Sequence, residues 1–187
     1  MSHGGVKEMI EKQGKFAITE SVAMALVELL KNKDLANIKV KEIVDKAGVS
    51  RMTYYRYYDS KEEILTTYAG EIINQFQQKL IQSERNYSYI THENLVLWLD
   101  YVCEHQKFII CLIENGMESF IYHAILRYQL GLSLNARRHW KDRYIVISYS
   151  NTLAGIMIEW VQSDPKESSD EIAALICELF QDKIRRY

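Results

Sequence analysis

The chain has 187 residues, of which 48% are hydrophobic and 26% are charged, enough for one large domain or a small module joined to a larger one. This composition excludes the intrinsically disordered and collagen-like classes. Eight glycines and one proline supply too few turns for a β-sandwich or barrel, and a net charge of −2, taken alone, argues against a nucleic-acid binder.

Cysteine spacing and the amino-terminal sequence indicate the compartment. Cys103, Cys111 and Cys177 are an odd number and widely spaced, without the pattern of a closed zinc site. Residues 1–14 lack the apolar stretch of a secretory signal, and no apolar window is long enough to cross a bilayer. We therefore expect a soluble, cytoplasmic protein with no membrane partner, no metal and no cofactor.

Helical periodicity of apolar residues predicts an all-α protein. Ser50 is a typical N-cap, Gly48 a typical helix end, and Ser60/Glu63 and Ser168/Glu171 are spaced as capping boxes. The predicted helices span residues 15–32, 40–47, 51–57, about 60–82, 91–104, 107–114, 117–139 and 141–163, with a last helix after Ser168.

Charge is unevenly distributed along this chain. Residues 31–61 carry eight basic and four acidic side chains, a net charge of +4, whereas residues 62–187 have a net charge of −5. The total charge therefore averages a basic segment of short helices and an acidic body. Short solvated helices that simply carry lysines would give the same pattern.

The two short helices 40–47 and 51–57, joined by a glycine-containing turn, have the layout of a helix-turn-helix. Helical spacing places Tyr54 and Tyr58 on an inward face and Arg51 and Tyr55 on an outward face. The second helix could then enter the major groove of DNA. An aromatic-rich helical hairpin within an all-α core is the alternative. The candidate DNA-binding residues are Ser50, Arg51, Met52, Thr53, Tyr55, Arg56, Tyr57 and Lys61.

Residues 38–65 closely resemble the DNA-binding signature of TetR-family transcriptional regulators, through the A-G-V-S turn, the T-x-Y core and the K-E-E-x-L start of the next helix. The resemblance implies an all-α homodimer with a DNA-binding domain over residues 1–60 and a helical ligand-binding and dimerisation domain over 61–187. It further implies phosphate contacts from Thr53, Tyr55, Tyr57 and Lys61, and base contacts from Arg51, Met52 and Arg56. Met52 departs from the glycine common in the family, and Tyr58 from the more usual phenylalanine.

The carboxy-terminal helices suggest a dimer interface. Ser148, Thr152 and Gly155 form a stripe of small residues that would let another helix approach closely. Ordinary packing within one chain could use the same stripe. The candidate dimerisation residues are Ser148, Thr152, Gly155, Ile156, Trp160, Ile172, Leu175 and Leu179.

Aromatic and polar side chains of the middle helices could line an effector pocket, although such stripes also fill cores. The candidates are Trp98, Tyr101, Phe108, Cys111, Phe120, His123 and Tyr128. A metal sensor built from Cys103, His105, Cys111 and His123 is an alternative that no ligand spacing supports.

These patterns predict a ligand-responsive DNA-binding regulator, a repressor that binds a palindromic operator as a homodimer and is released by a small effector. Its partners would be double-stranded DNA, the effector and a second copy of the chain. We expect no enzymatic activity, because the sequence contains no nucleophile elbow, phosphate-binding loop or zinc-protease motif. A helical adaptor or an activator of the same fold is the alternative.

Overall fold

A computed structural model describes residues 3–82, 91–132, 140–163 and 167–180. The described residues are helical without any strand, which confirms the predicted all-α class. The chain divides into two compact units, residues 1–71 and 72–187, whereas the sequence suggested a boundary after residue 60. Helix α4 (Lys61–Gln82) contributes to both units. Among the described helices, none combines the length and the apolar character needed to span a bilayer.

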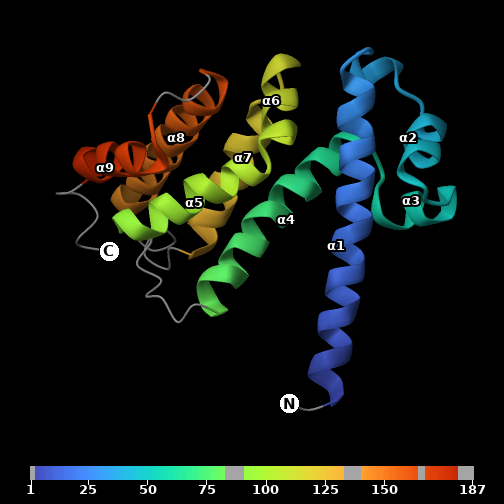
Figure 1. Ribbon diagram of the computed structural model, residues 1–187, viewed down its shortest axis with the longest axis horizontal. Coiled ribbons are helices and arrows are strands. Elements are labelled where there is room, and N and C mark those ends of the chain that lie inside the picture. Colours follow the sequence, from blue (N-terminus) through green and yellow to red (C-terminus); the bar gives the residue numbers. More distant parts are fainter. Residues whose placement is uncertain (1–2, 83–90, 133–139, 164–166, 181–187) are drawn as a thin grey trace. The chain divides into compact units, whose positions relative to one another are not determined.

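The first unit contains α1 (His3–Leu30), a 3-10 turn (η1, Leu35–Asn37), α2 (Val40–Ala47), α3 (Arg51–Tyr57) and the first turns of α4. Helix α2 packs on α1, and α3 packs on α2 (Figure 1). Apolar side chains from α1, α2 and α4, together with Tyr54 of α3, form the core, which keeps the two short helices at a fixed angle. The fully buried ones are Val22, Ala23, Leu26, Ile43, Ile64 and Leu65.

Helix α1 begins much earlier than predicted, at His3 rather than near residue 15. The prediction relied on the apolar stripe, which is recognisable only from Phe16 onward. Once a helix has nucleated, each added residue forms another backbone hydrogen bond, so a helix can extend beyond the segment whose pattern predicts it. The packed segment itself follows the prediction, since the ring of Phe16 lies 6.3 Å from that of Tyr68 on α4.

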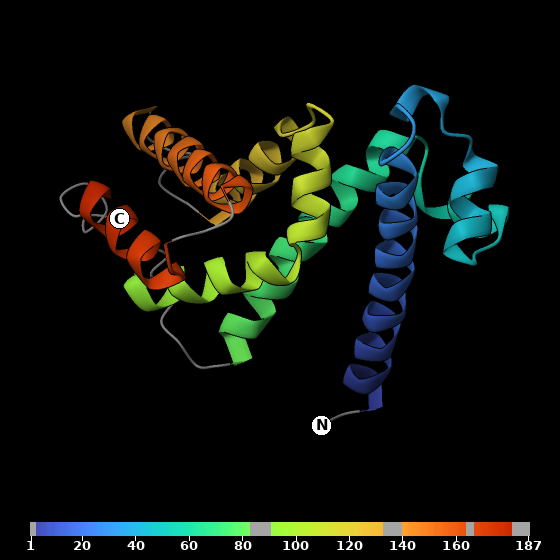
Figure 2. The ribbon, with the colours of Figure 1, turned by 45° about the horizontal axis from the view of Figure 1, so that its top comes forward.

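The second unit contains the last turns of α4 and five further helices. They are α5 (His92–Glu104), α6 (Gln106–Glu114), α7 (Ser119–Leu132), α8 (Trp140–Gln162) and α9 (Ser169–Phe180). Helix α9 packs on α5, and α8 packs on both α6 and α7 (Figure 2). Gly116, with a φ of 67°, confirms the predicted break after α6. The predicted continuation of α7 to residue 139 falls on residues 133–139, outside the described residues.

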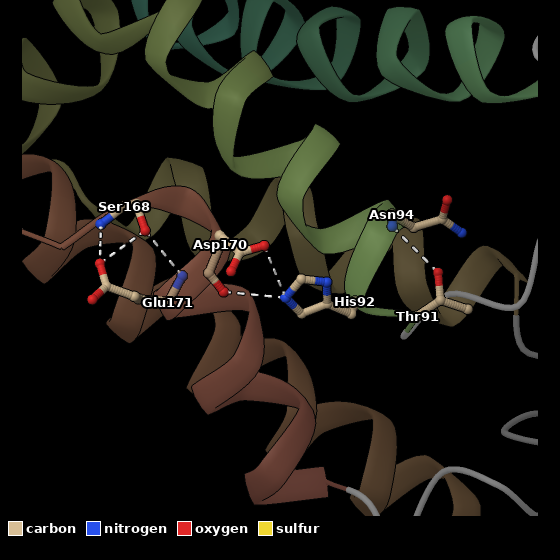
Figure 3. Close-up of polar contacts among 6 residues, drawn as sticks. All are labelled: Thr91, His92, Asn94, Ser168, Asp170 and Glu171. Carbon is tan, nitrogen blue, oxygen red and sulfur yellow. Dashed lines mark hydrogen bonds and ion pairs between the residues drawn. The ribbon is translucent and has the colours of Figure 1, made fainter.

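Side-chain caps fix the starts of α5 and α9 (Figure 3). The Asn94 backbone N–H donates to the Thr91 hydroxyl at 3.2 Å. The predicted capping box of α9 is present: the Glu171 N–H donates to Ser168 Oγ at 3.2 Å, and the Ser168 N–H donates to Glu171 Oε2 at 2.8 Å. His92 Nε2 lies 3.4 Å from Asp170 Oδ1, so the two capped ends meet.

Candidate functional site

The turn between α2 and α3 depends on one residue with a left-handed backbone. Gly48 has a φ of 68° and a ψ of 27°, and its N–H donates to the Val44 carbonyl. The next N–H, that of Val49, donates to the same carbonyl at 3.1 Å. Glycine adopts this conformation without a steric penalty, which explains the sharp reversal that aims α3.

The start of α3 is capped as the sequence predicted. Ser50 Oγ accepts a hydrogen bond from the Thr53 N–H at 3.0 Å and lies 2.9 Å from Thr53 Oγ1. The two hydroxyl groups are therefore hydrogen-bonded to each other, and Ser50 Oγ also caps the helix, without any ligand. The cap holds the first turn of α3 rigid where a DNA reader would contact base edges.

The predicted division of the α3 tyrosines into two faces is confirmed by their exposure. Tyr54 and Tyr58 are 1% and 2% exposed, whereas Tyr55 is 62% exposed. The Tyr54 and Tyr58 rings pack against each other, with centroids 5.5 Å apart. The Tyr58 hydroxyl is buried beside Thr19 without a hydrogen bond of normal geometry in the described part of the chain. Burial raises the pKa of Tyr58, and it raises the pKa of Tyr54 to about 12.

The raised pKa of Tyr54 predicts a loss of stability in alkali. Above pH 10 the tyrosine of the unfolded chain ionises, while the buried phenol stays protonated up to about pH 12. The folded state therefore keeps its full advantage below pH 10 and loses about 2 kcal/mol of unfolding free energy by pH 11.5. Tyr54→Phe should remove this part of the pH dependence in urea denaturation at pH 9 and 11.5, and Tyr55→Phe should keep it. Parallel pH profiles for wild type and Tyr54→Phe would contradict the assignment.

An exposed set of side chains covers the outer face of α3. Met52 is 75% exposed, and Arg51, Tyr55 and Arg56 are also exposed. Two guanidinium groups can bind phosphates or guanine edges, the phenol can donate to a phosphate, and the thioether can contact a thymine methyl. Thr53 and Tyr57 are only half-buried, so they border this set.

Lys61 is held by the protein itself. Its Nζ donates to the carbonyl oxygens of Leu35, Ala36 at 3.2 Å and Ile38 at 2.9 Å. An ammonium group has three N–H donors, and these three carbonyls accept all of them. The position of Lys61 at the start of α4 is as predicted, but its donors point to the η1 turn, 23 to 26 residues earlier in the chain.

Two lysines of the basic segment 31–61 are held in ion pairs with glutamates. Lys33 forms an ion pair with Glu42, and Lys31 pairs with Glu28 at 2.7 Å. The hydrogen bond from Lys33 and that from the Lys39 N–H hold the pKa of Glu42 below its usual value. Lys39, Lys41 and Lys46 are also exposed, so these lysines and the exposed arginines of α3 carry the positive charge that a partner would meet.

The second unit contains a hollow lined by α4, α5, α7 and α8. The space open to the centre of a water-sized sphere is about 50 Å³, and the whole space between the lining atoms, which includes open solvent, is about 540 Å³. The lining residues are Ile73, Phe76, Leu80, Asn94, Leu95, Trp98, Ile125, Tyr128, Gln129, Tyr149 and Leu153.

Two of the sequence-predicted effector residues, Trp98 and Tyr128, line this hollow. Tyr101, Phe108 and Cys111 are buried elsewhere in the core, Phe120 is half-buried, and His123 is exposed. The sequence did not predict the other nine lining residues, which include the polar Asn94, Gln129 and Tyr149. No periodicity within one helix could identify them, because the hollow exists only where four helices meet.

The predicted dimerisation residues fall into two groups. Ser148, Gly155, Leu175 and Leu179 are exposed, and Thr152 and Ile156 are half-buried. Trp160 and Ile172 are instead buried within the chain. The Trp160 indole N–H donates to the Glu167 carbonyl at 2.9 Å, which ties the end of α8 to the start of the α9 cap.

The cysteine and histidine side chains do not gather into a metal site in the described part of the chain. Across those residues no three histidine, cysteine, aspartate or glutamate side chains come close enough to hold an ion. His105 instead packs on Tyr101, with ring centroids 4.8 Å apart. Burial raises the pKa of the Cys103 and Cys177 thiols, which keeps both protonated.

Curated relatives are transcriptional regulators. The uncharacterized HTH-type transcriptional regulator YxbF of Bacillus subtilis (strain 168) is 25% identical over 169 residues, covering 87% of this chain and 44% of that protein. The HTH-type transcriptional regulator EthR of Mycobacterium tuberculosis is 36% identical over 67 residues, 36% of this chain and 31% of that protein. The chain thus spans less than half the length of these curated relatives.

Solved structures and family models agree on the fold. A TetR transcriptional regulator from Rhodococcus sp. RHA1 has a TM-score of 0.58 at 16% identity, covering 91% of this chain and 99% of that one. The dihydroxyacetone kinase operon activator DhaS has a TM-score of 0.55 at 20% identity, covering 91% and 97%. A model for bacterial regulatory proteins of the tetR family matches residues 24–67, and one for a transcriptional regulator C-terminal region matches residues 91–182. The chain therefore belongs to the TetR family of bacterial regulatory proteins.

Proposed function

We propose that this chain is a ligand-responsive transcriptional repressor that binds a palindromic operator as a homodimer in the cytoplasm. The observation that carries the proposal is the exposed set on α3: Arg51, Met52, Tyr55 and Arg56. A short helix with a rigid cap, a fixed approach angle and two exposed arginines suits the major groove. The family membership supports this interpretation, since its amino-terminal model matches the same residues.

Each exposed side chain on α3 has a proposed role. Arg51, in the first turn, would read a base edge, and a bidentate contact to guanine is the commonest use of arginine there. Met52 would contribute an apolar contact beside it. Tyr55 would contact a flanking phosphate. Arg56, which the family resemblance placed among the base contacts, lies in the last turn of α3, and we assign it to a phosphate that sets the register of the helix on the duplex.

Dimerisation and effector release complete the proposal. Two copies would pair through α8 and α9, where Ser148 and Gly155 leave room for close approach and Leu175 and Leu179 are exposed. Pairing of the same face on both copies is the arrangement expected of a two-fold dimer. The effector would enter the hollow between α4, α5, α7 and α8 and favour a conformation with weaker DNA affinity.

Selection of bound duplexes from a random pool, with the full chain as bait, tests this function. We expect enrichment of a palindromic site, because the two-fold symmetry of the protein is copied in its operator. On the selected duplex, Arg51→Ala should weaken binding roughly 5- to 150-fold and relax specificity at one base pair of each half-site.

Lys107→Ala is the matched control, since it removes an exposed charge from α6 in the other unit. It should leave duplex affinity within about twofold of the wild type. A pool without enrichment would disprove DNA recognition and favour a helical adaptor, and a non-palindromic half-site would disprove the homodimer.

DhaS, which shares the fold, is named an operon activator, so activation is the second candidate. The two directions of control differ in where the operator lies relative to the promoter. In a transcription assay with the selected operator overlapping the promoter, a repressor lowers transcript yield. An activator would raise it from an upstream operator.

A further inference from the structure

The chemistry of the hollow in the second unit defines a ligand class. Its described lining contains no charged side chain, and the polar groups there are two amides, two phenols and one indole. Burial raises the pKa of Tyr149, so this phenol stays neutral. An ion placed against such a wall would lose its hydration without gaining a counter-charge, so neutral ligands are favoured.

One polar group of the lining is unsatisfied. The Trp98 indole N–H is buried and has no acceptor among the described residues. The Trp98 ring instead packs edge-on against Phe76, with centroids 5.0 Å apart, and both rings line the hollow. By contrast, the Trp160 N–H has its acceptor, the Glu167 carbonyl, at 2.9 Å. A buried donor without a partner costs free energy, which an acceptor from a ligand would recover.

The size of the hollow limits the ligand further. About 50 Å³ of the hollow is open to the centre of a water-sized sphere, and one water molecule needs at least roughly 10–15 Å³ of such space, so the hollow can hold a small group. The remaining hollow opens to solvent and could take a larger apolar portion. Ile73, Leu95, Ile125 and Leu153 supply the apolar wall.

We propose that the hollow binds a compact, neutral, mainly apolar molecule with one hydrogen-bond-accepting oxygen, such as a ketone, ester or ether, and that the Trp98 indole N–H donates to that oxygen. The effector role of this ligand rests on the proposed function, whereas its binding in the hollow does not depend on that function. Asn94 and Gln129 add polar atoms on neighbouring helices.

Cyclopentanone is a suitable probe, with methylcyclopentane, cyclopentylammonium and cyclopentanecarboxylate as partners of matched shape. In the full chain labelled with ¹⁵N-tryptophan, cyclopentanone should shift the Trp98 indole resonance saturably and leave that of Trp140 unchanged. Methylcyclopentane should bind two- to tenfold more weakly, the range of one neutral hydrogen bond. The two charged compounds should produce no saturable shift.

Trp98→Phe keeps the apolar ring and removes the donor, so the preference for cyclopentanone over methylcyclopentane should disappear. Trp140→Phe is the control, because Trp140 is 70% exposed at the start of α8. Equal binding of a charged compound, or an unchanged preference in Trp98→Phe, would overturn the proposal. The wild-type ligand comparison decides the matter even if Trp98→Phe fails to fold.

Duplex affinity is measured separately, so the two proposals can fail independently. If cyclopentanone shifts the Trp98 resonance without changing the affinity for the selected duplex, the ligand class is supported and effector release is wrong. If the chain binds no duplex, the same titration still tests the hollow.

Discussion

Replacement of Lys61 by methionine is expected to weaken operator binding at least tenfold while leaving the salt dependence of binding nearly unchanged. The three carbonyls of Leu35, Ala36 and Ile38 would lose their common donor, and with it the link between α4 and the η1 turn. Hydrogen bonds from a charged group contribute roughly 1.5–3 kcal/mol each when buried, and less at this half-buried site. The free energy of unfolding should therefore also fall, by about 1–3 kcal/mol in total.

Two comparisons separate this positioning role from the phosphate contact that family resemblance implies. Arg56→Met removes an exposed charge from α3 and should reduce the slope of affinity against salt by about one unit. Lys61→Arg keeps the charge but replaces the compact ammonium with a planar guanidinium group. The N–H groups of a guanidinium lie in one plane, so they cannot donate to three converging carbonyls as the ammonium does. A phosphate contact would survive in Lys61→Arg. Near-wild-type affinity and stability of that variant, measured by duplex titration and urea denaturation, would therefore refute the positioning role.

The helix-turn-helix could be derived from sequence because its signals are local. Gly48 and Ser50 mark the turn through backbone and capping preferences within a few residues. The spacing of Tyr54 and Tyr58 fixes their inward face for the same reason. Such rules depend on neighbouring residues alone, so they predict both the elements and the exposed face of α3.

The contacts that sequence reasoning missed join residues distant in the chain. Lys61 meets carbonyls 23 to 26 residues earlier, and no pattern distinguishes such a lysine from one that faces solvent. The hollow likewise takes Asn94 from α5, Gln129 from α7 and Tyr149 from α8. Tertiary packing determines which face of each helix lines the hollow. The aromatic stripes therefore predicted only Trp98 and Tyr128 among the lining residues of the hollow.

Substitution of Gly48 should show whether backbone strain in this turn lowers operator affinity beyond the effect of reduced stability. Valine at this position would need a φ near 68°, which costs a β-branched residue about 1–2 kcal/mol or more. A Cβ would meet nothing within 4 Å, so the cost is conformational and not a clash. If the turn relaxes to another backbone conformation to relieve that strain, the orientation of α3 relative to α2 changes. We therefore expect Gly48→Val to lower operator affinity more than tenfold. Gly48→Asn should stay close to wild type, since asparagine tolerates the left-handed region.

Gly116 provides a matched control in the other unit. Its φ is 67°, and a Cβ there would also meet nothing within 4 Å. Gly116→Val should therefore cost a similar free energy of unfolding while changing operator affinity by no more than about twofold, because it lies between α6 and α7. If both valine variants lost DNA binding equally, the loss would follow from global stability. The orientation of α3 by Gly48 would then have no special part in recognition.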